Sequence, residues 1–381
     1  MPPASRLRSR LSLSLAAFAL AVLAGCASEP SPGTGPAPRP EEVRAQIVAL
    51  LPSTLADRPG WAVDIYAALA TLGVEPRPDK ICAVLAVTEQ ESSYRADPTV
   101  PRLGQLAREE IDRRAERAGV PKLLVSGALA LRSPDTRTWS ERIEAAKTEK
   151  ELSDLFEEFI GQVPLGQRLL AGYNPVRTGG PMQVSIDFAE HQVKTKPYPY
   201  RMAGSVRDEV FTRRGGLYFG VAHLLDYPAA YDQMLYRFAA FNAGRWASRN
   251  AAFQSAVSLL SGVPLERDGD LVVHGADPAR PGSTELATRA LGTRLGLSDA
   301  AIRSALEQDE HADFAKTRLY ARVFELADQL EQRPVPRAVL PKIRLQSPKI
   351  SRALTTEWFA RRVDERFRGC LARVERARAA S

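Results

Sequence analysis

The sequence of 381 residues is poor in the side chains that bind metals. It holds three cysteines and four histidines, and none of them forms an HExxH, a CxxC or a Cys/His cluster at zinc-ligand spacing. No GxxxxGK[ST] or GxGxxG run is present either, which argues against nucleotide chemistry. We therefore expect neither a metal site nor a cofactor.

Strongly basic segments are also absent. The formal net charge is +7, but lysine and arginine are scattered, without a block of five or more, which argues against a nucleic-acid partner. Hydrophobic residues make up 44% of the chain and charged residues 25%, a composition that excludes a wholly disordered protein. The mild positive charge is compatible with a polyanionic partner such as a bacterial cell wall.

The first 26 residues have the pattern of a lipoprotein signal. Residues 1–25 combine three early arginines with a mostly apolar run over 11–24, too short to span a bilayer comfortably. The run ends in Leu-Ala-Gly-Cys, which resembles a bacterial lipobox, in which the cysteine, here Cys26, is acylated and the peptide is cut before it. More than one acyl chain gives a lasting anchor. The alternative is an ordinary cleaved signal with a chance cysteine.

Residues 26–40 predict a tether after the anchor. Five prolines stand between residues 27 and 40, together with glycine, serine and threonine, which is typical of an extended linker. Ala27 follows Cys26, where an aspartate would retain such lipoproteins in the inner membrane of enteric bacteria. We therefore expect a lipid anchor in the outer membrane and a globular part in the periplasm.

Helical periodicity dominates from residue 41 onward and predicts a mainly α fold. One β-hairpin is expected over 263–274, around Asp268-Gly269. Four prolines between 332 and 348 separate a helical domain over 41–332 from a C-terminal helical arm over 333–381. The basic side chains of this arm either contact an anionic surface or form a solvated helix face. Helices are predicted at residues 41–51, 59–72, 79–94, 102–118, 138–159, 206–226, 229–241, 245–260, 284–295, 299–308, 312–332 and 354–377.

One of these helices leads to two candidate carboxylates. Residues 81–87 are apolar on every side, so this helix is expected to be buried. Glu89 and Glu91 follow near its end, about 160° apart on the helix, and should face different environments. A carboxylate that emerges from a buried helix is partly desolvated, which suits a general acid. The alternative is that both are solvated helix-end residues.

Two further motifs follow along the chain. Gly-Gly-Pro-Met-Gln-Val at 179–184 is a glycine turn, and Ala-Phe-Asn-Ala-Gly at 240–244 ends a helix. Each, taken alone, is equally a plain turn or a helix C-cap. In this order, after Glu-Ser-Ser-Tyr at 91–94, they resemble the three signatures of lytic transglycosylases with the goose-type-lysozyme-like fold. The resemblance covers roughly residues 79–253 and implies a lysozyme-like helical core.

The resemblance also implies a substrate and a site. The substrate is the glycan strand of peptidoglycan, and Glu91 is the single catalytic acid/base. Met182 and Phe241 would line the sugar cleft. The residues expected to bind substrate are Ser92, Gly180, Met182, Gln183, Phe241 and Asn242.

Two features depart from the family pattern. The long gap between Glu91 and Gly180 requires a helical insertion at 96–178, and Phe241 stands where tyrosine is usual. A non-catalytic cell-wall-binding or scaffold lipoprotein of the same fold is therefore the alternative function.

The remaining cysteines predict a disulfide. Once Cys26 is acylated, Cys82 and Cys370 are the only thiols left, and the periplasm is oxidising. Cys82 lies on the buried helix, and Cys370 lies on an apolar stripe with Phe359 and Val363. We predict that a Cys82–Cys370 bond pins the C-terminal arm to the catalytic helix. The alternative is two separate buried thiols.

Overall fold

The computed structural model describes residues 38–162, 168, 171–229, 231–275, 277, 279–345 and 354–380. The predicted signal peptide and Cys26 lie outside these residues. The described chain is mainly helical, as predicted, and one compact unit spans Val43–Ser381. No helix in the described part is long and apolar enough to cross a bilayer.

The elements in chain order are α2 Pro40–Leu50, α3 Arg58–Thr71, α4 Pro78–Ser92, α5 Leu103–Arg117, α6 Lys122–Leu129, α7 Trp139–Ala145, α8 Glu149–Gln162, η1 Ala171–Tyr173, β1 Thr178–Gly179, β2 Val184–Ser185, α10 Ile186–Thr195, α11 Val206–Val210, α12 Arg213–Leu225, α13 Met234–Ala243, α14 Ala247–Ser261, α15 Ser283–Ala290, α16 Gly292–Leu295, α17 Asp299–Leu306, η2 Ala312–Lys316, α18 Arg318–Glu331 and α19 Thr356–Ala379.

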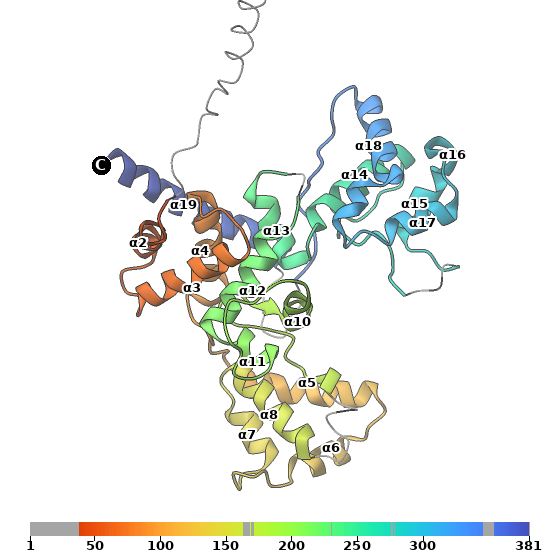
Figure 1. The fold of residues 1–381 in the computed structure, drawn as a ribbon. Coiled ribbons are helices and arrows are strands. Elements are labelled where there is room, and N and C mark those ends of the chain that lie inside the picture. The colour runs from red at the N-terminus through yellow and green to blue at the C-terminus, as the bar shows by residue number, and fades with distance from the viewer. Residues whose placement is uncertain are drawn as a thin grey trace, which may run out of the picture. The chain divides into compact units, whose positions relative to one another are not determined.

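The first hydrophobic core is built around α4. Every residue from 81 to 87 is buried, which confirms the predicted buried helix. Helix α19 lies along α4 and also packs against α13, while α3 packs against α12 (Figure 1). Burial of such an all-apolar helix is favourable because the apolar side chains on all of its faces are removed from water.

A second core lies among α14, α15, α17 and α18. The ring of Phe253 contacts those of Phe314 and Tyr320, at centroid distances of 5.1 and 6.2 Å. The single domain predicted over 41–332 is thus divided between two cores, and α19 returns the chain to the first one.

Helix caps divide two of the long predicted helices. The helix predicted over 138–159 is interrupted after α7, because Ala146 adopts an extended conformation and Thr148 starts α8. The Thr148 hydroxyl accepts from the Glu151 amide, and the Glu151 carboxylate accepts from the Thr148 amide, each at 3.2 Å. This reciprocal pair is a capping box, which favours a new helix start over continuation. Thr212 separates α11 from α12 in a similar way.

The hairpin predicted over 263–274 is wrong, because no strand forms there. Side chains of α14 hold this segment as a loop instead. Gln254 accepts from the Gly269 amide at 2.9 Å and donates to the Asp270 carbonyl at 3.1 Å. Asn250 donates to the Gly269 carbonyl at 3.0 Å. Backbone groups satisfied in this way have no need of a partner strand.

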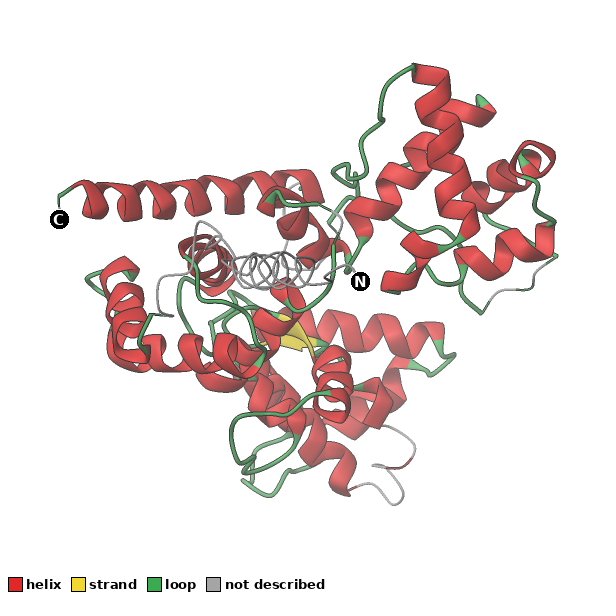
Figure 2. Ribbon diagram, turned by 45° about the horizontal axis from the view of Figure 1, so that its top comes forward, coloured by secondary structure: helices red, strands yellow, loops and turns green. Residues whose placement is uncertain are grey.

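The one sheet that the described residues form is a short hairpin elsewhere. Strands β1 and β2 pair antiparallel, with Thr178 opposite Ser185 and Gly179 opposite Val184. Figure 2 shows this hairpin in yellow among the surrounding helices. It holds the Gly-Pro-Met-Gln turn, and Ser185 caps α10 directly after it. Helix α10 is not among the helices predicted from the sequence.

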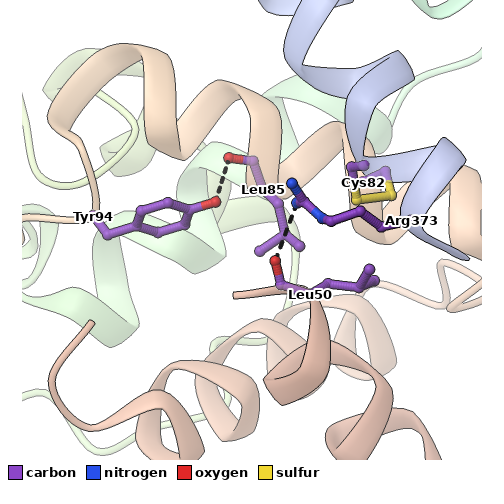
Figure 3. Close-up of a disulfide and its surroundings, with 6 residues drawn as sticks. Leu50, Cys82, Leu85, Tyr94 and Arg373 are labelled. Atoms are coloured by element: carbon purple, nitrogen blue, oxygen red, sulfur yellow. Dashed lines mark hydrogen bonds between the residues drawn. A yellow bond between two sulfur atoms is a disulfide. The ribbon is translucent and has the colours of Figure 1, made fainter. Parts of the chain in front are cut away.

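The predicted disulfide is confirmed. Cys82 of α4 and Cys370 of α19 are joined, with their Cα atoms 5.6 Å apart (Figure 3). Both cysteines are buried, and Phe359 and Val363 share the buried stripe of α19. The predicted C-terminal arm is therefore part of the first core.

Three of the seven arginines of α19 form ion pairs with acids of the same helix. Arg361 lies 2.8 Å from Glu357, Arg362 lies 2.7 Å from Glu365, and Arg368 lies 2.7 Å from Asp364. Pairs three or four residues apart stabilise an exposed helix by a few tenths of a kcal/mol each. This arrangement matches the solvated-face interpretation of the arm's charge.

Candidate functional site

Helix α4 carries Glu91 in its last turn. The helix ends because Ser93 and Tyr94 adopt left-handed backbone conformations, with φ of 51° and 60°. The Tyr94 hydroxyl then donates to the Leu85 carbonyl at 3.1 Å (Figure 3), and its ring lies at right angles to that of Trp61. Burial raises the pKa of Tyr94, so its hydroxyl keeps its proton. These contacts fold the chain back along the helix and fix the helix end, where Glu91 is half-buried.

Glu89 is engaged by the C-terminal helix. Its carboxylate lies 3.4 Å from Nε of Arg366 in α19, and its side chain is 43% exposed. Two residues along a helix change direction by about 160°, so the side chains of Glu89 and Glu91 leave α4 on different faces. The structure gives Glu89 an ion-pairing role toward α19.

Ser92 is buried at the end of the same helix. Its hydroxyl donates to the Thr88 carbonyl at 3.0 Å and accepts from the Arg95 amide at 3.2 Å. Such bonds satisfy backbone groups at a helix terminus. Ser92 therefore helps to end α4, and its expected contact with substrate stays a prediction.

The Gly-Pro-Met-Gln turn fits against glycines of α12. Gly216 faces the Pro181 ring and Gly220 faces the Met182 side chain, each so closely that a Cβ at either glycine would clash. Met182 is completely buried as a result. The expectation that Met182 lines a sugar cleft is thus wrong, because the Met182 side chain packs between the turn and α12 and has no exposed surface.

Gly180 is buried in the turn, and Gln183 is its partly accessible residue. Both have positive φ, at 75° and 50°. The Gln183 side-chain amide donates to the Gly180 carbonyl at 3.2 Å, and the Gln183 backbone amide donates to the same oxygen at 3.1 Å. Gln183 remains half-buried.

Substituting Gly180→Ala is expected to destabilise the fold by about 1–3 kcal/mol. Gly180 has φ of 75°, and an added Cβ would clash with the Val210 carbonyl oxygen, a backbone atom that cannot move aside alone. Thermal unfolding measures the loss. Gly172→Ala is a matched control, since a Cβ there meets nothing within 4 Å; an equal loss in both variants would contradict the prediction.

His223 joins the turn region to the Ala-Phe-Asn-Ala-Gly motif. Its ring lies edge-on to Phe188 of α10 and to Phe241 of α13, at centroid distances of 4.9 and 5.0 Å. The Nε2 atom is 3.2 Å from the Phe241 carbonyl. Burial lowers the pKa of His223 to about 4, and the charge of Arg245 adds to this shift. The ring is neutral at neutral pH and bridges three elements.

Arg245 completes this cluster. Its guanidinium lies 4.6 Å from the centroid of the Phe188 ring, and Nε donates to the His223 carbonyl at 3.3 Å. Phe188, His223 and Arg245 are not among the site residues predicted from the sequence. The available signals were a histidine inside an apolar helix and an arginine directly after the Ala-Phe-Asn-Ala-Gly motif.

Phe241 and Asn242 are neighbours at the end of α13 but differ in exposure to solvent. Phe241 is buried, with its ring packed on His223, whereas Asn242 is exposed. Gly244, with φ of 102°, then ends the helix. Asn242 is therefore accessible to solvent, and the Phe241 ring packs within this cluster; the sugar contacts expected of both residues stay predictions.

These contacts bring the second and third motifs together around α12. The turn packs on the Gly216 and Gly220 face of α12, and His223 of the same helix holds Phe241. Helix α4, which carries Glu91, also packs against α12. In the described part of the chain, no group of three or more His, Cys, Asp or Glu side chains is arranged to hold a metal ion.

The geometry is thus that of a mainly helical protein whose three motif-bearing segments meet on one central helix. The chain belongs to the family described as "Protein of unknown function (DUF1615)", whose model matches residues 54–373. That range contains both disulfide cysteines and all three motifs. "Uncharacterized protein YaiW" of Escherichia coli (strain K12) is similar to it, with 52% identity over 330 residues, 87% of this chain and 90% of that protein. No solved structure matches the chain.

Proposed function

We propose that this protein is a peptidoglycan lytic transglycosylase that a lipid anchors in the bacterial envelope. The observation that carries the proposal is the position of Glu91, half-buried in the last turn of a helix whose residues 81–88 are all buried. The packing of α4 and of the two other motifs on α12 supports it. The resemblance of these motifs to transglycosylase signatures supplies the reaction class.

The proposed mechanism uses one carboxyl group. Ordinary glycosidases use two, and the neighbouring Glu89 is paired with Arg366. Glu91 protonates the glycosidic oxygen as the bond to the muramoyl C1 breaks. The substrate's own acetamido group stabilises the developing cation. The Glu91 carboxylate then takes the proton of the C6 hydroxyl, whose oxygen closes on C1 to give a 1,6-anhydro product.

The direct test is digestion of purified murein by the purified full-length protein. The proposal expects soluble fragments that end in 1,6-anhydromuramoyl residues, identified by mass spectrometry. Hydrolysed, reducing ends would indicate a lysozyme-type reaction and contradict the transglycosylase assignment. No cleavage at all would favour the non-catalytic function below.

Asn242→Ala is expected to weaken turnover without removing it. The exposed amide of Asn242 is proposed to hold a sugar substituent, and loss of one such hydrogen bond costs about 0.5–1.5 kcal/mol. This corresponds to a rate reduction of roughly three- to tenfold. Initial rates of murein solubilisation measure it, and a complete loss of cleavage would show that Asn242 does more than bind.

The lipid anchor is a separate part of the proposal and rests on the sequence around Cys26. Cys26→Ser should remove the lipid mass from the N-terminal peptide and leave the protein out of the outer-membrane fraction. Fractionation followed by mass spectrometry of that peptide tests it. The lipobox interpretation would be excluded if the Cys26→Ser variant still fractionated with the outer membrane and the wild-type N-terminal peptide carried no lipid.

A non-catalytic cell-wall-binding protein of the same fold is the second candidate. The burial of Met182 and Phe241 favours it, because both side chains were expected to touch sugar. Its signature would be co-sedimentation with insoluble murein in the absence of any released fragment.

A further inference from the structure

Helices α5, α6, α7 and α8 border an apolar cavity that is open to solvent. Its volume is about 1080 Å³, whereas a cavity of about 150 Å³ already accepts benzene. The walls are aliphatic and aromatic side chains, among them Ile111, Val125, Leu152, Leu155 and Phe159. A space of this size and lining suits a long hydrocarbon chain.

The charged residues of the cavity are mostly cations. Arg114, Arg117 and Arg177 line it together with one carboxylate, that of Glu110. Glu110 lies 2.6 Å from Arg114 and 3.7 Å from Arg117, so a single acid faces several guanidinium groups. The excess positive charge favours a ligand with an anionic head.

Helix α6 borders the cavity and buries little of its own surface. Leu123 and Leu124 are 82% and 64% exposed, and of the helix residues Leu129 alone is buried. Leu124 lines the cavity as well. Apolar side chains exposed beside an apolar cavity mark a place where a nonpolar ligand can enter.

We propose that this cavity binds a long-chain fatty acid. The hydrocarbon tail lies among the side chains of α5, α7 and α8, and the carboxylate meets the arginines of the cavity. Carboxylates accept paired hydrogen bonds from guanidinium groups, which explains the preference for arginine. This proposal does not depend on the proposed cleavage of glycan strands.

The first experiment measures binding of palmitic acid to the full-length protein, delipidated and held in amphipol without detergent. Binding is expected to weaken about 250-fold for the acid that is four methylenes shorter, because each buried methylene strengthens it about fourfold. Ala128→Trp, which places an indole in the cavity, should abolish binding. Ala130→Trp is the control, since Ala130 is exposed and does not line the cavity.

The second experiment tests the head group. Arg117→Gln should weaken palmitic acid binding about three- to tenfold and leave hexadecanol binding unchanged, while Arg117→Lys should retain most of the affinity. Equal affinity of the wild type for the acid and the alcohol would overturn the proposal. So would unchanged binding in Ala128→Trp. Association with anionic vesicles without any binding of monomeric fatty acid would also overturn it and indicate a membrane-docking surface.

Discussion

Glu91→Gln is expected to abolish cleavage of murein by this protein. Glutamine matches glutamate in shape but can neither give a proton to the glycosidic oxygen nor take one from the C6 hydroxyl. A positioned acid or base contributes about 10²–10⁴-fold to a rate, and Glu91 is proposed to act as both. We therefore expect the release of anhydro products to fall by at least about 10³-fold, measured by quantitative mass spectrometry of the digest.

The fold should not change in this variant. Glu91 is half-buried at a helix end, and substitutions at such places typically alter the free energy of unfolding by less than about 1 kcal/mol. Equal thermal midpoints for the wild type and Glu91→Gln would therefore assign the lost activity to chemistry.

Glu89→Gln is the matched control on the same helix. It removes the partner of Arg366, an ion pair at a partly exposed site worth about 0–1 kcal/mol, and should leave cleavage nearly unchanged. An inactive Glu89→Gln beside an active Glu91→Gln would show that the catalytic carboxylate had been assigned to the wrong residue.

Loss of the Cys82–Cys370 disulfide should destabilise the protein by about 2–5 kcal/mol. The bond closes a loop of 288 positions, so the chain-entropy model gives about 5–6 kcal/mol as an upper figure, which native strain and residual structure in the unfolded chain reduce. The double variant Cys82→Ala/Cys370→Ala avoids a lone thiol. Denaturant unfolding of this variant and of the oxidised wild type measures the difference.

Chemical reduction of the wild type provides an independent comparison. If the bond is the cause, the reduced wild type should unfold at nearly the same denaturant concentration as the double variant. Two free thiols in the denatured, unreduced protein from the periplasm would contradict the presence of the bond in cells.

The parts of the fold that were predicted depend on local patterns. An unbroken apolar run fixes the burial of α4, since no orientation of that helix leaves a polar face outside. The disulfide followed from the apolar stripe of α19 and from having only two thiols to pair. Likewise, the different surroundings expected for Glu89 and Glu91 follow from helix geometry. For Glu89 these surroundings include Arg366 of α19.

What the sequence did not predict depends on distant partners. Met182 is buried because Gly216 and Gly220 leave room for the turn on α12, and nothing within the turn itself indicates this. The false hairpin at 263–274 had suitable turn residues, but its backbone bonds go to Gln254 and Asn250. A period-two pattern of apolar residues does not indicate that side chains from another helix will take the place of a partner strand.

The position of α19 has a consequence for how the protein is made. This helix is the last element that the structure describes, yet it packs along α4 and α13 in the first core. A nascent chain therefore cannot complete that core until α19 has been made, because the wall covering Cys82 is still missing. Contacts between residues this far apart also form slowly. Until α19 arrives, α4 exposes its apolar side, which is the kind of surface that chaperones bind and that aggregates when left uncovered.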